Sequence, residues 1–149
     1  CIKKIHIISG GGSGQEVINK LFYYGFDLSL GVLNVGDTDY TLGRSLGIPT
    51  VEEVPFSAIS DKSNRKNIEM VNKSDIVIIT AVAIGQGNLK NYEVAHNALR
   101  QGKKVYFIGS NDFKKLDYTN GKGIKIIDDM LDLGLIIVED IEGFLKLEG

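Results

Sequence analysis

Short runs of apolar, mostly β-branched residues alternate along the chain with longer stretches in which apolar residues recur every three or four positions. The short runs are nearly continuous in isoleucine and valine, which indicates strands buried on both faces, as in a parallel sheet covered by helices. The predicted strands are Lys4–Ser9, Leu28–Val35, Pro49–Val54, Asp75–Ala81, Lys104–Gly109 and Leu135–Glu139.

The longer stretches predict helices, several of which are followed at once by a glycine. A glycine directly after the last apolar position is typical of a helix C-terminus. The predicted helices are Ser13–Tyr24, Thr38–Leu46, Ser60–Asn72, Asn88–Arg100, Lys125–Leu133 and Ile141–Leu147. The alternation predicts a Rossmann-like α/β fold: a doubly wound, mainly parallel sheet of five to six strands with helices on both faces.

Composition narrows the class of protein without changing this picture. A length of 149 residues fits one domain, residues 1–149, and a net charge of -2 does not favour nucleic acid as a partner. The apolar runs are far shorter than the ~20 residues of a membrane span, so direct membrane insertion is not expected. A single cysteine excludes an internal disulfide and fits a cytoplasmic location. Because Cys1 opens the chain without a methionine, we expect a domain taken from a longer protein.

A glycine-rich turn follows the first predicted strand in the sequence IISGGGSGQE, residues 7–16. Such a turn lets a phosphate approach the backbone and directs helix N–H groups at it. The spacing does not match the dinucleotide fingerprint, since the sixth position from Gly10 is Gln15, and no lysine completes a P-loop. The predicted anion-binding residues are Gly10, Gly11, Gly12, Ser13 and Gly14. A tight turn without a ligand is the alternative.

Polar residues also follow the second predicted strand. Asn34 and Asp37 stand near the position at which an acidic residue of dinucleotide-binding proteins accepts hydrogen bonds from a ribose. Asp37 or Asp39 could equally cap the next helix, and both could contribute to a site for a hard cation. We therefore keep Asn34 and Asp37 as binding candidates beside the capping interpretation.

The fourth predicted strand leads into a second loop of small residues, with Gly85, Gly87 and Asn88 before a helix. In an open α/β sheet, ligands bind beyond the carboxyl ends of the strands, where the strand order reverses. We expect this loop to face the glycine-rich turn across that crevice. Asn88 has a capping role as its alternative.

No catalytic set emerges from the titratable residues. His6 alternates with isoleucines inside a predicted strand, which favours a packed, hydrogen-bonded core histidine, and no metal-ligand spacing is present. A small enzyme acting on a nucleotide or sugar phosphate stays open as an alternative, with Asp37, Asp39 or Asp112 as its acid or base.

Four segments in this order, GGGSG, GFDLSLGVLNVGDTD, LGIPTVEEVPFS and GNLKN, resemble a domain at the C-terminus of some prokaryotic ATP-binding subunits of ABC importers. These importers belong to the iron-siderophore, haem and cobalamin class, and the resemblance runs from Ile5 to about Leu147. The ATPase motifs of those subunits are absent from these residues. The resemblance implies an accessory domain that senses a ligand or regulates the transporter from the cytoplasmic side, with the parent ATPase as its partner. It does not imply ATP hydrolysis by this domain.

The fold pattern is also similar to that of the molybdenum-cofactor-carrier and lysine-decarboxylase-like proteins, which place a glycine-rich turn at a nucleotide phosphate. Their second loop, PGGxGT, is replaced here by AIGQGN at residues 83–88, which argues against phosphoribohydrolase activity. The cofactor stays unknown within the class of nucleotides and other phosphate-bearing ligands. A third function is dimerisation or docking through Tyr23, Tyr24 and Phe26, although core packing is the favoured role for these aromatic residues.

Overall fold

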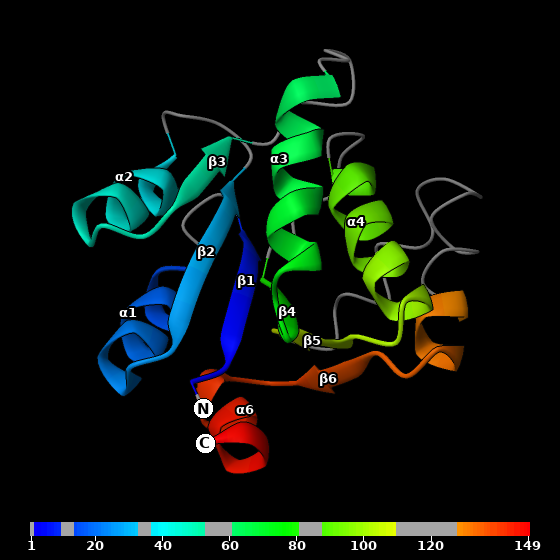
Figure 1. The fold of residues 1–149 in the computed structure, drawn as a ribbon. Helices are drawn as coiled ribbons and strands as arrows, with labels where there is room; N and C mark the ends of the chain where they lie inside the picture. Colours follow the sequence, from blue (N-terminus) through cyan, green and yellow to red (C-terminus); the bar gives the residue numbers. More distant parts are fainter. Residues whose placement is uncertain (1, 10–13, 33–36, 53–60, 81–87, 110–127) are drawn as a thin grey trace.

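Strands and helices alternate as the sequence predicts (Figure 1). The computed structural model describes residues 2–9, 14–32, 37–52, 61–80, 88–109 and 128–149, with the backbone alone at 52, 61–64 and 88–93. The strands are β1 (Lys4–Ser9), β2 (Asp27–Val32), β3 (Thr50–Glu52), β4 (Ile76–Ile79), β5 (Lys104–Ile108) and β6 (Ile136–Val138). The helices are α1 (Gln15–Tyr24), α2 (Thr38–Ser45), α3 (Asp61–Asn72), α4 (Asn88–Arg100) and α6 (Ile141–Glu148), and residues 128–132 are also helical.

The strands form one parallel sheet in the order β3-β2-β1-β4-β5-β6, which confirms the predicted Rossmann-like fold. From β1 the chain adds β2 and β3 on one side, and it then crosses over to add β4, β5 and β6 on the other. The strand order therefore reverses between β1 and β4, which pair directly, with Ile8 opposite Ile79. In such sheets a ligand crevice opens beyond the carboxyl ends of the two strands at the reversal.

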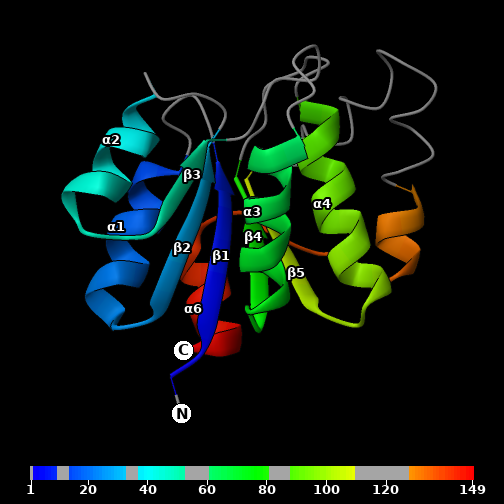
Figure 2. The same ribbon diagram turned by 45° about the horizontal axis from the view of Figure 1, so that its top comes forward.

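Alternation along each strand divides the core between the two faces of the sheet. Ile5 and Ile7 of β1 belong to a cluster with α1, α2 and α6, whereas Ile8 belongs to a second cluster with α3, α4 and residues 128–132. Figure 2 shows α1 and α2 on one side of the sheet, and α3 beside α4 on the other. The strands are apolar on both faces because each face is covered, as the isoleucine and valine runs predict.

Helix ends follow the residues that the sequence marks. The four glycines after predicted helices all adopt positive φ angles, which only glycine accepts without strain: Gly25, Gly47, Gly102 and Gly134. At the other end, Asp140 caps α6 by accepting a hydrogen bond from the Gly143 N–H at 2.9 Å. None of the helices that the structure describes has the length and apolarity needed to cross a membrane.

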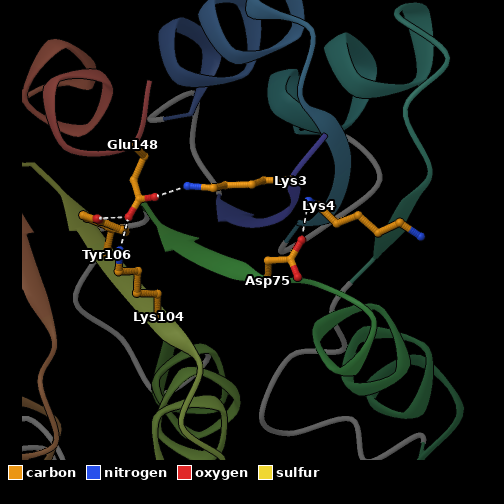
Figure 3. Close-up of polar contacts among 6 residues, drawn as sticks. All are labelled: Lys3, Lys4, Asp75, Lys104, Tyr106 and Glu148. Atoms are coloured by element: carbon orange, nitrogen blue, oxygen red, sulfur yellow. Dashed lines mark hydrogen bonds and ion pairs between the residues drawn. The ribbon is translucent and has the colours of Figure 1, made fainter. Parts of the chain in front are cut away.

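The amino edge of the sheet is closed by a buried carboxylate from the end of the chain. Helix α6 returns to the start of β1, and its Glu148 side chain, 2% exposed, receives hydrogen bonds from Lys3 at 2.7 Å, from the Tyr106 hydroxyl at 2.7 Å and from Lys104 (Figure 3). Burial opposes ionisation of Glu148, but the three donors outweigh it and lower its pKa to about 2. Beside this cluster, the backbone N–H of Lys4 donates to Asp75 at 2.9 Å.

Candidate functional site

At the opposite, carboxyl edge of the sheet, two polar side chains meet at Gly14, where α1 begins. The Gly14 N–H donates a hydrogen bond to Asp39 Oδ2 at 3.0 Å, and Ser9 is the last residue of β1. A Cβ atom added at Gly14 would lie 2.7 Å from Ser9 Cβ and 3.1 Å from Asp39 Oδ2. Only a glycine therefore leaves both side chains in place, which explains in structural terms why the last position of the predicted turn is a glycine.

The polar atoms at this edge are not all satisfied. Ser9 and Asp39 are both 0% exposed. Within the part of the chain that the structure describes, Ser9 Oγ and Asp39 Oδ1 have no hydrogen-bond partner. An unsatisfied buried donor or acceptor costs about 1–3 kcal/mol of stability, so it calls for an explanation. These two atoms lie beside the strand reversal, where a ligand is expected to bind.

The Asp39 carboxyl is more easily protonated than an ordinary aspartate. Burial raises its pKa, while the Gly14 N–H opposes the rise by donating to the ionised form. The Ser9 hydroxyl also lowers the pKa through its proximity, although its position falls short of hydrogen-bond geometry. The charge of Asp37 acts in the same direction as burial, and the pKa is raised overall.

Asp37 and Asp39 have different roles, which the sequence does not separate. The Asp37 side chain accepts a hydrogen bond from the Asp39 N–H at 3.0 Å and so caps α2, as the capping interpretation predicts. Asp39 instead reaches across to α1. Among the described residues, no group of three or more histidine, cysteine or acidic side chains could hold a metal ion, so the cation interpretation of this pair gains no support.

Most of the predicted binding residues cannot be compared with the structure. Gly14 and Asp37 are described, and both are hydrogen-bonded to Asp39: Gly14 donates to its carboxylate, and Asp37 accepts its N–H. Helix α4 begins at Asn88, whose side chain is not described. The other predicted binding residues lie outside the described residues: Gly10, Gly11, Gly12, Ser13, Asn34, Gly85 and Gly87. The acid–base candidate Asp112 also lies outside them. Their part in ligand binding stays a prediction.

Two hydroxyl residues at this edge were not among the predicted binding residues. Ser9 ends β1, and Thr80, which follows β4, is also buried and donates its N–H to the Ile8 carbonyl at 2.9 Å. The signal in the sequence is a polar residue directly after a run of isoleucine or valine, at the carboxyl end of the strand. In a strand buried on both faces, such a residue lies at the carboxyl edge, where ligands bind.

His6 links three elements in the interior. Its Nδ1 lies 2.7 Å from Ser29 Oγ of β2, and its Nε2 is hydrogen-bonded to Asn67 Oδ1 of α3. Burial lowers the pKa of His6, and the hydrogen bond with Asn67 raises it. Burial is the larger effect, so the pKa falls to about 4. A base this weak is poorly matched to proton transfer near neutral pH. The prediction of a packed, hydrogen-bonded core histidine is confirmed.

A separate open groove of about 550 Å³ lies between α1 and α6. It is lined by Tyr23 and Tyr24, which are 80% and 61% exposed, so the favoured core role of these two residues is wrong. The reason is that α6 covers the neighbouring Phe26 but leaves the last turn of α1 open. Phe26 does pack against the core, with its ring centroid 6.4 Å from that of Phe144.

Most of the chain matches a family of known proteins in sequence. The sequence profile of the MJ0874 family matches residues 28–145, a stretch that begins after the glycine-rich turn. The uncharacterized protein MJ0874 of Methanocaldococcus jannaschii is 28% identical over 80 residues, which cover 54% of this chain and 86% of that protein. The cobalamin import ATP-binding protein BtuD of Halobacterium salinarum is also 28% identical over 80 residues, but the match spans only 19% of its length.

Solved structures of low sequence identity share this fold. BdcA in complex with NADPH superimposes with a TM-score of 0.57 at 16% identity, over 91% of this chain and 68% of that one. Shikimate dehydrogenase from Aquifex aeolicus gives a TM-score of 0.53 at 15% identity, over 91% of this chain and 41% of the enzyme. At these identities the likeness shows the Rossmann-like fold alone.

Proposed function

The chain belongs to the MJ0874 family, and we propose that it is a Rossmann-like accessory domain that binds a small ligand and regulates an ABC importer ATPase. The ligand is nucleotide-like or otherwise phosphorylated, and it lies along the glycine-rich turn. The domain works on the cytoplasmic side, with the ATPase as its partner, in an importer of the iron-siderophore or cobalamin class. In this proposal residues 1–149 are one domain of a longer protein.

One observation supports the ligand site most strongly. Ser9 and Asp39 meet at Gly14, beside the reversal of strand order between β1 and β4, and among the described residues their buried Oγ and Oδ1 atoms have no hydrogen-bond partner. That is the position at which α/β sheets bind ligands. The transporter context draws its support from the relative named as a cobalamin import ATP-binding protein, of which this chain matches about a fifth.

A thermal-shift screen of nucleotides and corrinoids tests the proposal. A ligand at a hundred times its Kd should stabilise the wild-type protein by about 2.7 kcal/mol. The variant Gly14→Ala should lose this stabilisation, because its methyl group would displace Ser9 and Asp39. Gly143→Ala in α6, where the added Cβ would also meet a close contact at 3.3 Å, is the matched control and should keep it. The proposal fails if no compound stabilises the protein at millimolar concentration, or if both variants respond alike.

Docking is a second candidate function, favoured by the groove with exposed Tyr23 and Tyr24. Exposed tyrosines that line a groove are typical of protein contact surfaces. In this proposal two copies of the chain associate through α1 and α6. Light scattering should then show a dimer that Tyr23→Ser with Tyr24→Ser converts to a monomer. A wild-type monomer at high concentration would contradict self-association.

A further inference from the structure

The N-terminus of α1 already holds a negative group from within the protein. Asp39 Oδ2 accepts the Gly14 N–H at 3.0 Å, and Glu16 adds a second acidic side chain in the first turn of the helix. The positive end of a helix dipole is the place where a phosphate would otherwise bind. Among the described residues, no lysine, arginine or histidine forms an ion pair with Asp39. An incoming phosphate would therefore meet a carboxylate that no described cationic side chain neutralises.

The unpartnered atoms indicate which chemical group fits instead. Asp39 Oδ1 is a carboxylate oxygen, which accepts hydrogen bonds while the group is ionised, so its missing partner is a donor. Ser9 Oγ can donate or accept. A hydroxyl or amino group that reached both atoms would satisfy them, whereas a phosphate oxygen could satisfy only Ser9. Both atoms are shielded from solvent, so the incoming group must displace part of their packing against Gly14.

We propose that Asp39 sets the ligand specificity of the carboxyl edge: at Gly14 the site accepts a hydrogen-bond-donating group, a hydroxyl or an amine, and excludes phosphate. The inference rests on the proposed function, because it assigns one end of the same ligand. The phosphate of a nucleotide-like ligand then lies away from Gly14, while the part of the ligand that carries hydroxyl groups contacts Ser9 and Asp39.

Amide chemical shifts of the 15N-labelled protein test this orientation with two probes. Adenosine carries hydroxyl and amino groups without a phosphate, and inorganic pyrophosphate carries phosphates alone. In the wild-type protein adenosine should shift the amides of Ser9 and Gly14, and pyrophosphate should leave them unchanged. Asp39→Asn removes the charge and Asp39→Ser also vacates the space, so both should bind pyrophosphate at Gly14 at least tenfold more tightly. Asp27→Asn, the same charge change at the exposed amino end of β2, should have no such effect.

The outcomes separate this inference from the proposed function. Pyrophosphate that shifts Gly14 in the wild-type protein, with no gain in the Asp39 variants, overturns the inference and leaves a ligand site in place. If neither probe shifts the amides of Ser9 and Gly14 in the wild-type protein, the result counts against the proposed function. A gain of pyrophosphate binding in Asp39→Ser would still support the role of Asp39. If the Asp39 variants do not fold, the wild-type protein alone tests the inference: shifts of Ser9 and Gly14 with adenosine but not with pyrophosphate support it, and shifts with pyrophosphate overturn it.

Discussion

Two buried carboxylates lie at opposite edges of the sheet, and their surroundings differ. At the amino edge, Glu148 receives hydrogen bonds from two lysines and a tyrosine, and its pKa falls to about 2 (Figure 3). At the carboxyl edge, the Asp39 carboxylate accepts the Gly14 N–H, its other oxygen has no partner among the described residues, and its pKa rises. The described residues satisfy the first carboxylate, whereas they leave one oxygen of the second without a hydrogen-bond donor.

The number of hydrogen bonds that each carboxylate accepts distinguishes the structural cluster at Glu148 from the candidate site at Asp39. Buried polar groups in folded proteins are nearly always satisfied, and exceptions tend to occur where function requires them. Glu148 fastens the last helix to β1 and β5, and it follows the rule. Ser9 and Asp39 depart from the rule at the edge where α/β sheets bind ligands.

The largest effect is expected at the amino edge. Glu148→Gln removes the charge that Lys3, Lys104 and Tyr106 share, and it should lower the free energy of unfolding by about 2 kcal/mol, measured by urea denaturation at neutral pH. Glu142→Gln is the matched control, because Glu142 lies in the same helix and pairs with Lys20 while exposed. That exposed pair should make no measurable difference. Equal losses of stability in the two variants would contradict the structural role assigned to Glu148.

Acid should abolish this difference. The pKa of Glu148 lies below its ordinary value of 4.5, so its stabilising contribution is complete above about pH 4.5 and is lost as the pH falls toward 2. The gap in unfolding free energy between wild type and Glu148→Gln should therefore shrink across that window. His6, whose contribution is lost between pH 6.5 and about 4, is present in both proteins and cancels in the comparison. A gap that stays constant to pH 2 would contradict the assignment.

Much of this fold could be predicted from local patterns. The bounds of β1 and α4 agree with the predicted ranges, because continuous apolar runs, helical spacing and terminal glycines act over a few neighbouring residues. The contacts that define the two edges could not be predicted. Gly14 meets Asp39 across 25 positions, and Lys3 meets Glu148 across 145. Such pairs depend on strand order and on where each helix packs.

The carboxyl edge shows the same limit. The glycine-rich turn marks the correct end of β1. The sequence leaves Asp39 as a helix cap, a cation ligand or an acid–base candidate, without its contact to Gly14, and it does not single out Ser9. The exposure of Tyr23 and Tyr24 was also missed, because helical spacing shows which side chains could face the core without showing how far the next helix covers them. Hydrogen bonds that are absent, like those of Ser9 Oγ, appear only once the neighbours are placed.

The variant Ser9→Ala tests the carboxyl edge with a smaller effect on stability. The buried Ser9 hydroxyl has no hydrogen-bond partner among the described residues, so its removal relieves a desolvation cost. The free energy of unfolding should stay equal or rise by up to about 1 kcal/mol. Ser45→Ala is the control, because the Ser45 hydroxyl is exposed and donates to the Leu42 carbonyl at 2.8 Å. A clear loss of stability in Ser9→Ala would show that Ser9 is satisfied within the protein.

The affinity of that same variant tests the central claim most directly. Isothermal titration would compare wild type, Ser9→Ala and Ser45→Ala with the nucleotide or corrinoid that stabilises the wild-type protein most. If the carboxyl edge keeps Ser9 for a ligand, Ser9→Ala should bind about tenfold more weakly without losing stability, which corresponds to one lost hydrogen bond of about 1.4 kcal/mol, and Ser45→Ala should bind as wild type does. Equal affinity in all three proteins would contradict a ligand site at Ser9, Gly14 and Asp39.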